Sequence, residues 1–422
     1  MSGQSALKAQ MQSPKRLSQQ DVDLICNKHD RLWAAKPGGA RAVFSWCDLS
    51  GLDLSGRNLS DADFTGAILS DCRLMGTRLD HATLYCADLQ HADLSEASLK
   101  RADLRGACLR GCDLTGADMF EADLREGSIA AADAKMGFLL IEPGRRLSEA
   151  QGAVLAGANL ERSRMSGVIA VKADFTDAIL KDAKLVRANL KQANMSGCNM
   201  AGADLSGADF AGADLRDAVL VGATLNSCSF DGCQMTGTLT DKVVGKAVGV
   251  LPYAEMLMDH AQWCETQGQL GKPSVFDGAD LRALTSVKGY NLTALSAKGA
   301  IFYGLDMEGV QLQGAHLEGA DFRGAKLRRA DLRGARLSRA KLSGADLREA
   351  LMGPLLLGKD RMMPCDLSRA TIKGSDLRGA DLRRAVLNEA DLTRSDLTGA
   401  FLREAEMENT LTRGVKGLEI KL

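Results

Sequence analysis

The stretch ADLQHADLSE (residues 87–96) contains two copies of one five-residue repeat: small, acidic, leucine, polar, polar. The repeat recurs from Cys47 almost to the C-terminus. An amphipathic helix needs apolar residues at a mean spacing near 3.6, and a half-buried strand needs them at every second residue. A strict period of five fits neither pattern over any length, so the sequence predicts another kind of repeating structure.

Each repeat by itself has the pattern of a short strand followed by a corner. Ala87 and Leu89 point to one face of such a strand, and Asp88 points to the other. The last two residues, typically Ser-Gly, Thr-Gly or Arg-Gly, turn the chain, and Gly suits the positive φ that such turns often need. Repetition winds the chain into a coil whose successive turns pair by their edges around a column of Leu and Ala. The sequence therefore predicts an all-β solenoid.

The Ala-Asp-Leu-x-x series resembles the pentapeptide-repeat family, and the matching repeats cover most of the chain. The resemblance implies a right-handed quadrilateral β-helix with four repeats in each coil. The four sides and the handedness come from the resemblance, because the period of five does not fix them.

The length and composition agree with a stacked array. An array of 422 residues grows without enlarging its core, and the low aromatic content (4%) suits a narrow interior. The net charge of −1 describes neither a polyanion nor a polycation. No apolar run approaches the roughly 20 residues that span a bilayer, and Met1–Gln20 has no signal-peptide core. We expect a cytoplasmic protein without a membrane span.

Seven of the eleven cysteines stand two residues before the central apolar residue, in the inward position usually held by Ala. Free cysteine commonly replaces a small buried residue. This register predicts buried thiols in a reducing compartment, in place of disulfides or metal ligands. The seven are Cys47, Cys72, Cys112, Cys198, Cys228, Cys233 and Cys365.

Residues 1–45 are predicted to contain a disordered start (1–16) and an N-terminal capping helix. Ser18 is the expected N-cap, with Asp21 at the third position. A helix here would cover the unpaired backbone of the first coil. Its expected apolar stripe consists of Val22, Ile25, His29, Leu32 and Trp33.

Residues 46–240 are predicted to form a first β-helix. Central residues recur every five positions from Leu49 to Ile129 and again from Leu155 to Met235. Between these runs the register slips by one residue. We interpret residues 130–153 as a bulge or loop within one β-helix.

Residues 241–275 contain no repeats, and we expect a linker with a second capping helix that begins at Pro252. Its His260 and Trp263 resemble His29 and Trp33 of the first helix, and each pair precedes a return to repeats. Residues 276–422 then form a second β-helix with a C-terminal cap. A single rod with an insertion is the alternative.

Two details of the second β-helix follow from its register. Residues 353–364 depart from the repeat but keep the period, which would place Leu357 and Met362 at central positions in a swollen side of one coil. The tail after Thr410 carries enough apolar residues to cover the last coil.

The sequence predicts no enzyme, no cofactor and no metal. Cys26-x-x-His29 and His260-x-x-x-Cys264 could be halves of a zinc site only if the two helices met, and the helices should cap different ends. The outward Asp of each repeat is interpreted as a solvated surface group. No phosphate-binding Gly loop or nucleophile motif stands in its structural context.

Charge is distributed unevenly along the chain. Residues 46–129 contain 15 acidic and 8 basic residues, a net charge of −7, whereas residues 322–348 contain 9 basic and 2 acidic residues, a net charge of +7. With four repeats per coil, the basic residues form a belt around the rod, whereas a nucleic-acid backbone would be better matched by a stripe along it. The belt favours an acidic protein partner or serves solubility. Its candidate interaction residues are Arg323, Arg328, Arg329, Arg333, Arg336 and Arg339.

We therefore predict a non-catalytic scaffold or protein-interaction module with a protein partner and no nucleic-acid partner. The resemblance implies an alternative, because some family members mimic duplex DNA and bind a type II topoisomerase such as gyrase through a strongly anionic rod. A secreted bacterial effector is a second alternative. Two copies could also form a homodimer by stacking end to end.

Overall fold

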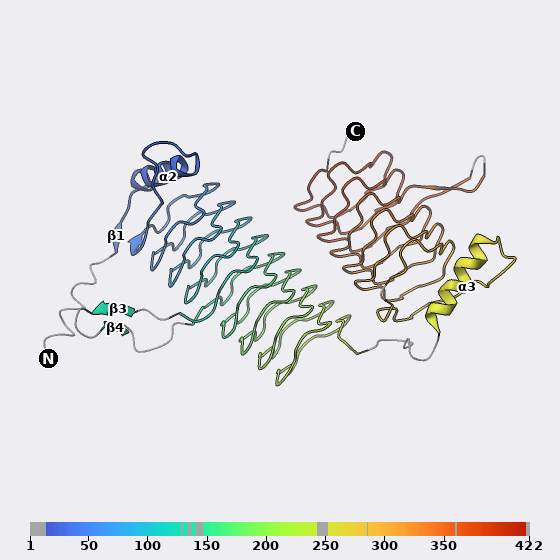
Figure 1. Cartoon of the computed structure of the whole chain (residues 1–422), viewed down its shortest axis with the longest axis horizontal. Helices are drawn as coiled ribbons and strands as arrows, with labels where there is room; N and C mark the ends of the chain where they lie inside the picture. The colour runs from blue at the N-terminus through green and yellow to red at the C-terminus, as the bar shows by residue number, and fades with distance from the viewer. Residues whose placement is uncertain are drawn as a thin grey trace. The chain divides into compact units, whose positions relative to one another are not determined.

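The computed structural model describes residues 14–127, 130–133, 137–140, 147–242, 252–284, 286–358 and 361–418. The chain divides into two compact units, Met1–Asp241 (unit 1) and Lys242–Leu422 (unit 2), each a stack of coils (Figure 1). Most of the predicted disordered start, and the predicted central residue Ile129, lie outside the described residues. The elements are β1 (Lys15–Arg16), α2 (Gln19–Trp33), β2 (Cys47–Asp48), β3 (Ala130–Asp133), β4 (Gly137–Leu140), α3 (Tyr253–Glu265), β5 (Leu355–Leu356) and β6 (Met362–Met363).

Each coil of the stack consists of four repeats. The outward residue of one repeat forms a parallel bridge with the residue twenty positions on, as in the series Asp48, Ile68 and Asp88. The next residue continues the ladder, since the N–H of Leu49 donates to the carbonyl oxygen of Ile68 at 2.8 Å. The predicted quadrilateral β-helix is confirmed.

The inner column contains the Ala and Leu of each repeat. Ala87 and Leu89 are completely buried. Larger residues are accommodated where two coils carry them at the same place, as in the stacked rings of Phe302 and Phe322, whose centroids are 4.7 Å apart. Because burial of each Leu stabilises the fold by about 1.5–3 kcal/mol, the column is the main source of stability. Each unit has its own core.

Two hairpins interrupt the stacking without ending it. Cys108 bridges Glu149, forty-one positions on, and the extra residues include the antiparallel pair β3–β4. Arg336 bridges Asp366, thirty positions on, and the extra ten residues include the antiparallel pair β5–β6. Both arms project from their stacks (Figure 1).

The β5–β6 hairpin corrects the expectation for residues 353–364. Leu357 and Met362 were expected at inward central positions, but each is 47% exposed. The period survived because an insertion of ten residues equals two repeats, so the register after the hairpin is unchanged. Residues 353–364 therefore form a projecting hairpin and do not widen one side of the coil.

The described part of the C-terminal tail continues the solenoid. Leu411 bridges Asp391, and Lys416 bridges Asp396, in the same register as the preceding coils. Leu411 is 58% exposed because it occupies an outward position. Up to Leu418 the tail adds to the last coil, and its Val415 and Leu418 are partly buried against the core of unit 2. Ile420 lies outside the described residues, so the C-terminal cap stays a prediction.

Both helices pack on the first coil of their unit. The N-terminus of α2 has the predicted capping box, in which Ser18 and Asp21 hydrogen-bond to each other's backbone N–H groups. The buried residues of α2 are Val22, Cys26 and His29. Leu32 and Trp33 are about half exposed, so the buried stripe is narrower than expected. Among the described residues, no helix is long and apolar enough to cross a membrane.

Candidate interaction surfaces

The two capping helices are each fastened by one buried histidine. Nδ1 of His29 accepts the N–H of Ala42 at 3.0 Å, and Nδ1 of His260 accepts the N–H of Ser274 at 3.0 Å. Each acceptor nitrogen requires the proton of a neutral ring to be on Nε2. Nε2 of His260 lies 3.1 Å from the carbonyl oxygen of Thr293, which it faces as a donor.

The two histidines occupy equivalent places. His29 also hydrogen-bonds to a backbone carbonyl, that of Ser60, which closes the first coil of unit 1 as Thr293 closes that of unit 2. Burial lowers the pKa of His29 and of His260, which favours the neutral form that this bonding requires. Trp33 lies edge-on to His29, with ring centroids 6.4 Å apart and its Nε1 3.2 Å from Nε2 of His29. Trp263 is tilted against His260, with ring centroids 5.7 Å apart. The two histidines therefore hold the capping helices on the first coils by hydrogen bonds to the backbone.

The suggested halves of a zinc site belong to different units. Cys26 is buried in unit 1, and burial raises the pKa of its thiol to about 11. The Sγ of Cys264 lies 3.5 Å from the carbonyl oxygen of Thr293 in unit 2. In the described part of the chain, no group of three or more His, Cys, Asp or Glu side chains could hold a metal ion. The eleven cysteines, all of them described, are free.

The outward Asp of the repeat has a structural role that the sequence interpretation missed. Oδ1 of Asp93 accepts the N–H of Ser95 at 2.9 Å and its hydroxyl at 2.6 Å. This bond across two residues holds the corner, as in an Asx turn. The same bonds from Ser55, together with Arg73, lower the pKa of Asp53 to about 2. These carboxylates are parts of the turns and are more than solvated surface.

Where Arg follows the central residue, it replaces the hydroxyl. Arg323 donates from Nε and Nη2 to Asp321 at 2.9 and 2.6 Å, in the bidentate geometry that makes such pairs strong. The side chains of Arg323 and Asp321 are only 7% and 10% exposed. Arg323 is therefore buried and does not belong to an exposed belt, which corrects its choice as a candidate interaction residue.

The other arginines of the belt divide into two groups. Arg328 and Arg329 both pair with Glu349 on the next coil, at 2.9 and 2.6 Å. Arg333 pairs with Asp331 at 2.6 Å within its own repeat. Arg336 and Arg339 are exposed and form no ion pair with another described residue. Among the six candidate arginines, these last two are the ones whose charge is not paired with a described carboxylate.

No side of the first acidic block carries a carboxylate in every coil. One stack of bridged outward positions runs Asp53, Arg73, Asp93, Asp113, and another runs through Ile68 and Cys108. A continuous acidic face is the feature that a duplex-DNA mimic needs. The acidic side chains of residues 46–127 are interrupted by basic and apolar side chains on these sides.

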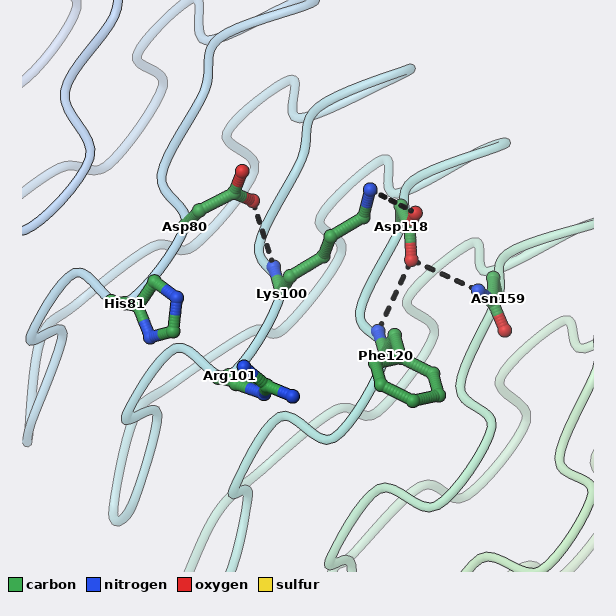
Figure 2. A pocket seen from close by; sticks show the side chains of 7 residues that line it. All are labelled: Asp80, His81, Lys100, Arg101, Asp118, Phe120 and Asn159. Atoms are coloured by element: carbon green, nitrogen blue, oxygen red, sulfur yellow. Dashed lines mark hydrogen bonds and ion pairs between the residues drawn. The ribbon is translucent and has the colours of Figure 1, made fainter.

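A shallow depression of about 400 Å³ lies on one side of unit 1 (Figure 2). Lys100 forms an ion pair with Asp118 at 3.1 Å, and the backbone N–H of Lys100 donates to Asp80 at 3.1 Å. Asp118 also accepts from the amide of Asn159 at 2.9 Å. Figure 2 shows these groups bonded to one another along the wall of the depression.

The β5–β6 hairpin presents three neighbouring exposed apolar side chains on unit 2. Leu356 and Met362 are cross-strand partners, 68% and 47% exposed, and Leu357 beside them is 47% exposed. Sequence reasoning missed this surface because it read the segment by its period. The flanking Pro354 and Pro364, which are unusual inside a stacked coil, were the available signal.

Comparison with known protein families gives one clear match. The model described as "Pentapeptide repeats" matches residues 42–128, 149–239, 315–352 and 365–404, more than half of the chain. No curated protein sequence matches the chain.

Solved structures similar to the chain include pentapeptide-repeat proteins of several sources. Rfr23 from the cyanobacterium Cyanothece 51142 is 26% identical, covering 33% of this chain and 91% of its own, with a TM-score of 0.24. HetL from Nostoc sp. strain PCC 7120, involved in heterocyst differentiation regulation, is 22% identical over 91% and 93%, with a TM-score of 0.16. QnrB1, a plasmid-mediated fluoroquinolone resistance protein, is 20% identical over 50% and 94%, with a TM-score of 0.25.

Proposed function

The chain belongs to the pentapeptide-repeat family, and we propose that it is a non-catalytic scaffold that binds protein partners through fixed outer surfaces. One observation carries the proposal. The polar side chains of the repeats are tied to their own turns or to the next coil, as in Asp93 with Ser95 and Arg329 with Glu349. Side chains fixed in this way present a preorganised surface for binding, and they do not converge on a reacting atom.

Affinity capture tests this function. The full-length protein, tagged and immobilised, is incubated with lysate of its native host, and retained proteins are identified by mass spectrometry. We expect one or more proteins to be retained and then released by an excess of untagged protein. Equal recovery with and without the untagged competitor would contradict a specific scaffold.

The DNA-mimic alternative has less support. The net charge of −7 in residues 46–129 favours it, but the outward stacks are interrupted by residues such as Arg73 and Ile68. A gyrase supercoiling assay with the protein in micromolar excess separates the two functions. A scaffold for other partners leaves supercoiling unchanged, whereas a mimic changes it.

The proposal also includes self-association and a cytoplasmic setting. In the last described coils of unit 1, the central residues Leu225 and Phe230 are only partly buried, unlike those further inside the stack. Exposed coil ends of this kind support end-to-end stacking of two copies. Sedimentation velocity over a range of concentrations tests this, and an unchanging monomer contradicts it. The eleven free cysteines suit a reducing cytoplasm.

A further inference from the structure

Every coil of unit 1 has two different edges that fit each other. Inside the stack, the N–H of Leu54 donates to the carbonyl oxygen of Arg73 on the next coil at 2.8 Å. The N–H of Arg73 in turn donates back to the carbonyl oxygen of Leu52 at 3.0 Å. Because all coils repeat this pattern, the first coil of one copy is complementary to the last coil of another copy.

The edge at the end of unit 1 is not used by the described residues. In the coil before it, the N–H of Phe210 donates to the carbonyl oxygen of Ser229 at 2.9 Å. The corresponding N–H groups of the last coil, those of Leu225 and Phe230, have no acceptor among the described residues. Met235 of the same coil is 39% exposed. This edge therefore offers both hydrogen-bond donors and apolar surface.

The edge at the start of unit 1 is occupied by a side chain of α2. Asp53 holds in the first coil the place that Arg73 holds in the second. The N–H of Asp53 donates to Oε1 of Gln19 at 2.9 Å, and Nε2 of Gln19 donates to the carbonyl oxygen of Asp53 at 2.8 Å. The amide of Gln19 thus makes the two bonds that a preceding coil would make. It follows that α2 and another coil cannot occupy this edge at the same time.

A second bond of α2 to this coil depends on protonation. Nδ1 of His29 accepts the N–H of Ala42 at 3.0 Å. A protonated ring carries a hydrogen on Nδ1 that would face the N–H of Ala42, so this bond exists only for neutral histidine. His29 is 1% exposed, which leaves a charged ring little access to water while the helix is in place. Acid therefore weakens the hold of α2 on the first coil.

The charged groups around His29 do not reverse this effect. Burial lowers the pKa of His29, and Arg41 acts in the same direction. The carboxylates of Asp30, on α2, and of Asp61, on the coil, favour the protonated ring, but the pKa of His29 remains below its ordinary value. The folded helix therefore prefers the neutral ring throughout the range in which a free histidine gains its proton.

The other polar groups of α2 keep their state over this range. Burial raises the pKa of the Cys26 thiol to about 11, so it stays neutral. Hydrogen bonds from Ser18 lower the pKa of Asp21, so the carboxylate of the capping box stays charged. The amide of Gln19 does not titrate. Among these contacts, the bond of His29 is the one that mild acid breaks.

We propose that α2 is an acid-released block on head-to-tail stacking. When His29 is protonated, α2 leaves the first coil of unit 1, and this coil binds the last coil of unit 1 of a second copy. The occupant is a second copy because the bonds that the edge needs are those of a coil of the same unit. The inference rests on the proposed self-association and names its surfaces and its signal. A contact between two unlike ends does not close, so chains of copies form.

Sedimentation velocity and light scattering of the full-length protein test the response to acid. The protein is measured at pH 7.5, at pH 5.5 and after return to pH 7.5, over a range of concentrations. We expect the mean mass at pH 5.5 to be about threefold that at pH 7.5 or more, to rise with concentration and to fall again at pH 7.5. An unchanged mass, or an acid product no larger than a dimer, overturns the proposal.

Two histidine variants identify the titrating group. His29→Gln cannot gain a proton, so its mass should differ little between the two pH values, whether the variant helix holds or releases the coil. His81→Gln, which alters an exposed histidine of unit 1, should assemble in acid as the wild type does. An acid response that is the same in His29→Gln and His81→Gln overturns the role of His29.

Two double variants identify the other end of the contact. Leu225→Gln combined with Met235→Gln removes apolar surface from the last coil and should abolish growth in acid. The matched control is Met75→Gln combined with Ile179→Gln, which alters side chains that are 54% and 41% exposed on the sides of unit 1. This control should grow as the wild type does. Equal growth of the two double variants overturns the proposed contact.

The outcomes separate this inference from the proposed self-association. A monomer at pH 7.5 that grows reversibly at pH 5.5 contradicts stacking under neutral conditions and supports the acid-released block. A dimer at pH 7.5 that does not grow at pH 5.5 supports self-association and overturns the block. Growth that persists after return to pH 7.5 indicates aggregation of unfolded protein and also overturns the block.

Discussion

The two units stack the same repeat but complete its corner differently. In unit 1 the residue after the central Leu is often Ser or Thr, and its hydroxyl bonds to the Asp, as in Ser95 with Asp93. In unit 2 the same position is often Arg, which donates two hydrogen bonds to the Asp, as in Arg383 with Asp381. Unit 1 contains 26 basic and 31 acidic residues, and unit 2 contains 27 and 23, so the net charges are −5 and +4.

This difference shows which positions the fold leaves open. The inward column admits little beyond Ala, Leu and similar apolar residues, because each coil must match the next. The outward position after the central residue accepts any group that donates a hydrogen bond to the Asp. The surface charge of a unit can therefore change sign while the backbone stays the same, which is how one fold presents different surfaces to different partners.

The largest expected effect concerns the cores. Leu89→Ala in unit 1 and Leu347→Ala in unit 2 each remove a completely buried side chain, and each should lower the free energy of unfolding by about 2–5 kcal/mol. We expect each substitution to speed hydrogen exchange only in its own unit, because each unit has its own core. Mass spectrometry of peptides from both units checks this. Equal loss of protection in both units would contradict independent units and favour one continuous rod.

The next effect separates a buried pair from an exposed pair of the same geometry. Arg323→Ala leaves Asp321 buried without its partner and should cost about 3–5 kcal/mol in unfolding free energy. Arg216→Ala in unit 1 breaks a pair with Asp214 of the same 2.6 Å length whose Arg is 55% exposed, and should cost much less unfolding free energy, because solvent screens an exposed pair. Urea denaturation of both variants measures the difference. Similar losses would mean that the burial of Arg323 has no energetic consequence.

Acid should affect both caps in the same direction. Burial lowers the pKa of His29 and His260, so the unfolded chain binds protons more readily than the folded one. The stabilisation is complete above the ordinary histidine pKa near 6.5 and is lost as pH falls below it toward the folded values. The protection factors of amides in α2 and α3, which are corrected for the intrinsic pH dependence of exchange, should therefore fall between pH 7.5 and 5.5.

Two substitutions control this experiment. His29→Gln should weaken the acid response of α2 and leave that of α3 intact. His81→Gln, which alters an exposed histidine, should change neither helix. An acid response of α2 that persists unchanged in His29→Gln would point to a titrating group other than His29.

The smallest expected effect concerns the exposed ion pairs between neighbouring coils in the two units. Glu121→Gln in unit 1 and Glu349→Gln in unit 2 each remove the acceptor of two arginines, which are Arg101 and Arg162 in the first case and Arg328 and Arg329 in the second. Each should lower the melting temperature slightly at low salt and less at high salt, because solvent and ions screen exposed pairs. Thermal unfolding at two salt concentrations measures both. A loss that is independent of salt would indicate packing in place of charge.

Particular residues show how far sequence reasoning reached. The period of five predicted the solenoid, and Ser18 with Asp21 predicted the start of α2, because both patterns act through neighbouring residues. The hairpin at 353–364 was missed because ten added residues preserve a period of five. The structural role of Asp93 was missed because outward direction was taken to mean a free side chain.

The sequence by itself determined the coil, its inner column and the helical caps, since these depend on contacts that repeat at fixed spacing. Only the tertiary structure decided which outward side chains remain available. Arg323 and Arg333 both follow the central residue of their repeat and both pair with the Asp of that repeat at 2.6 Å, yet the side chain of Arg323 is 7% exposed and that of Arg333 is 44% exposed. The physical reason is that burial of an outward residue depends on chain brought to it from other coils and segments, and that information is absent from any single repeat.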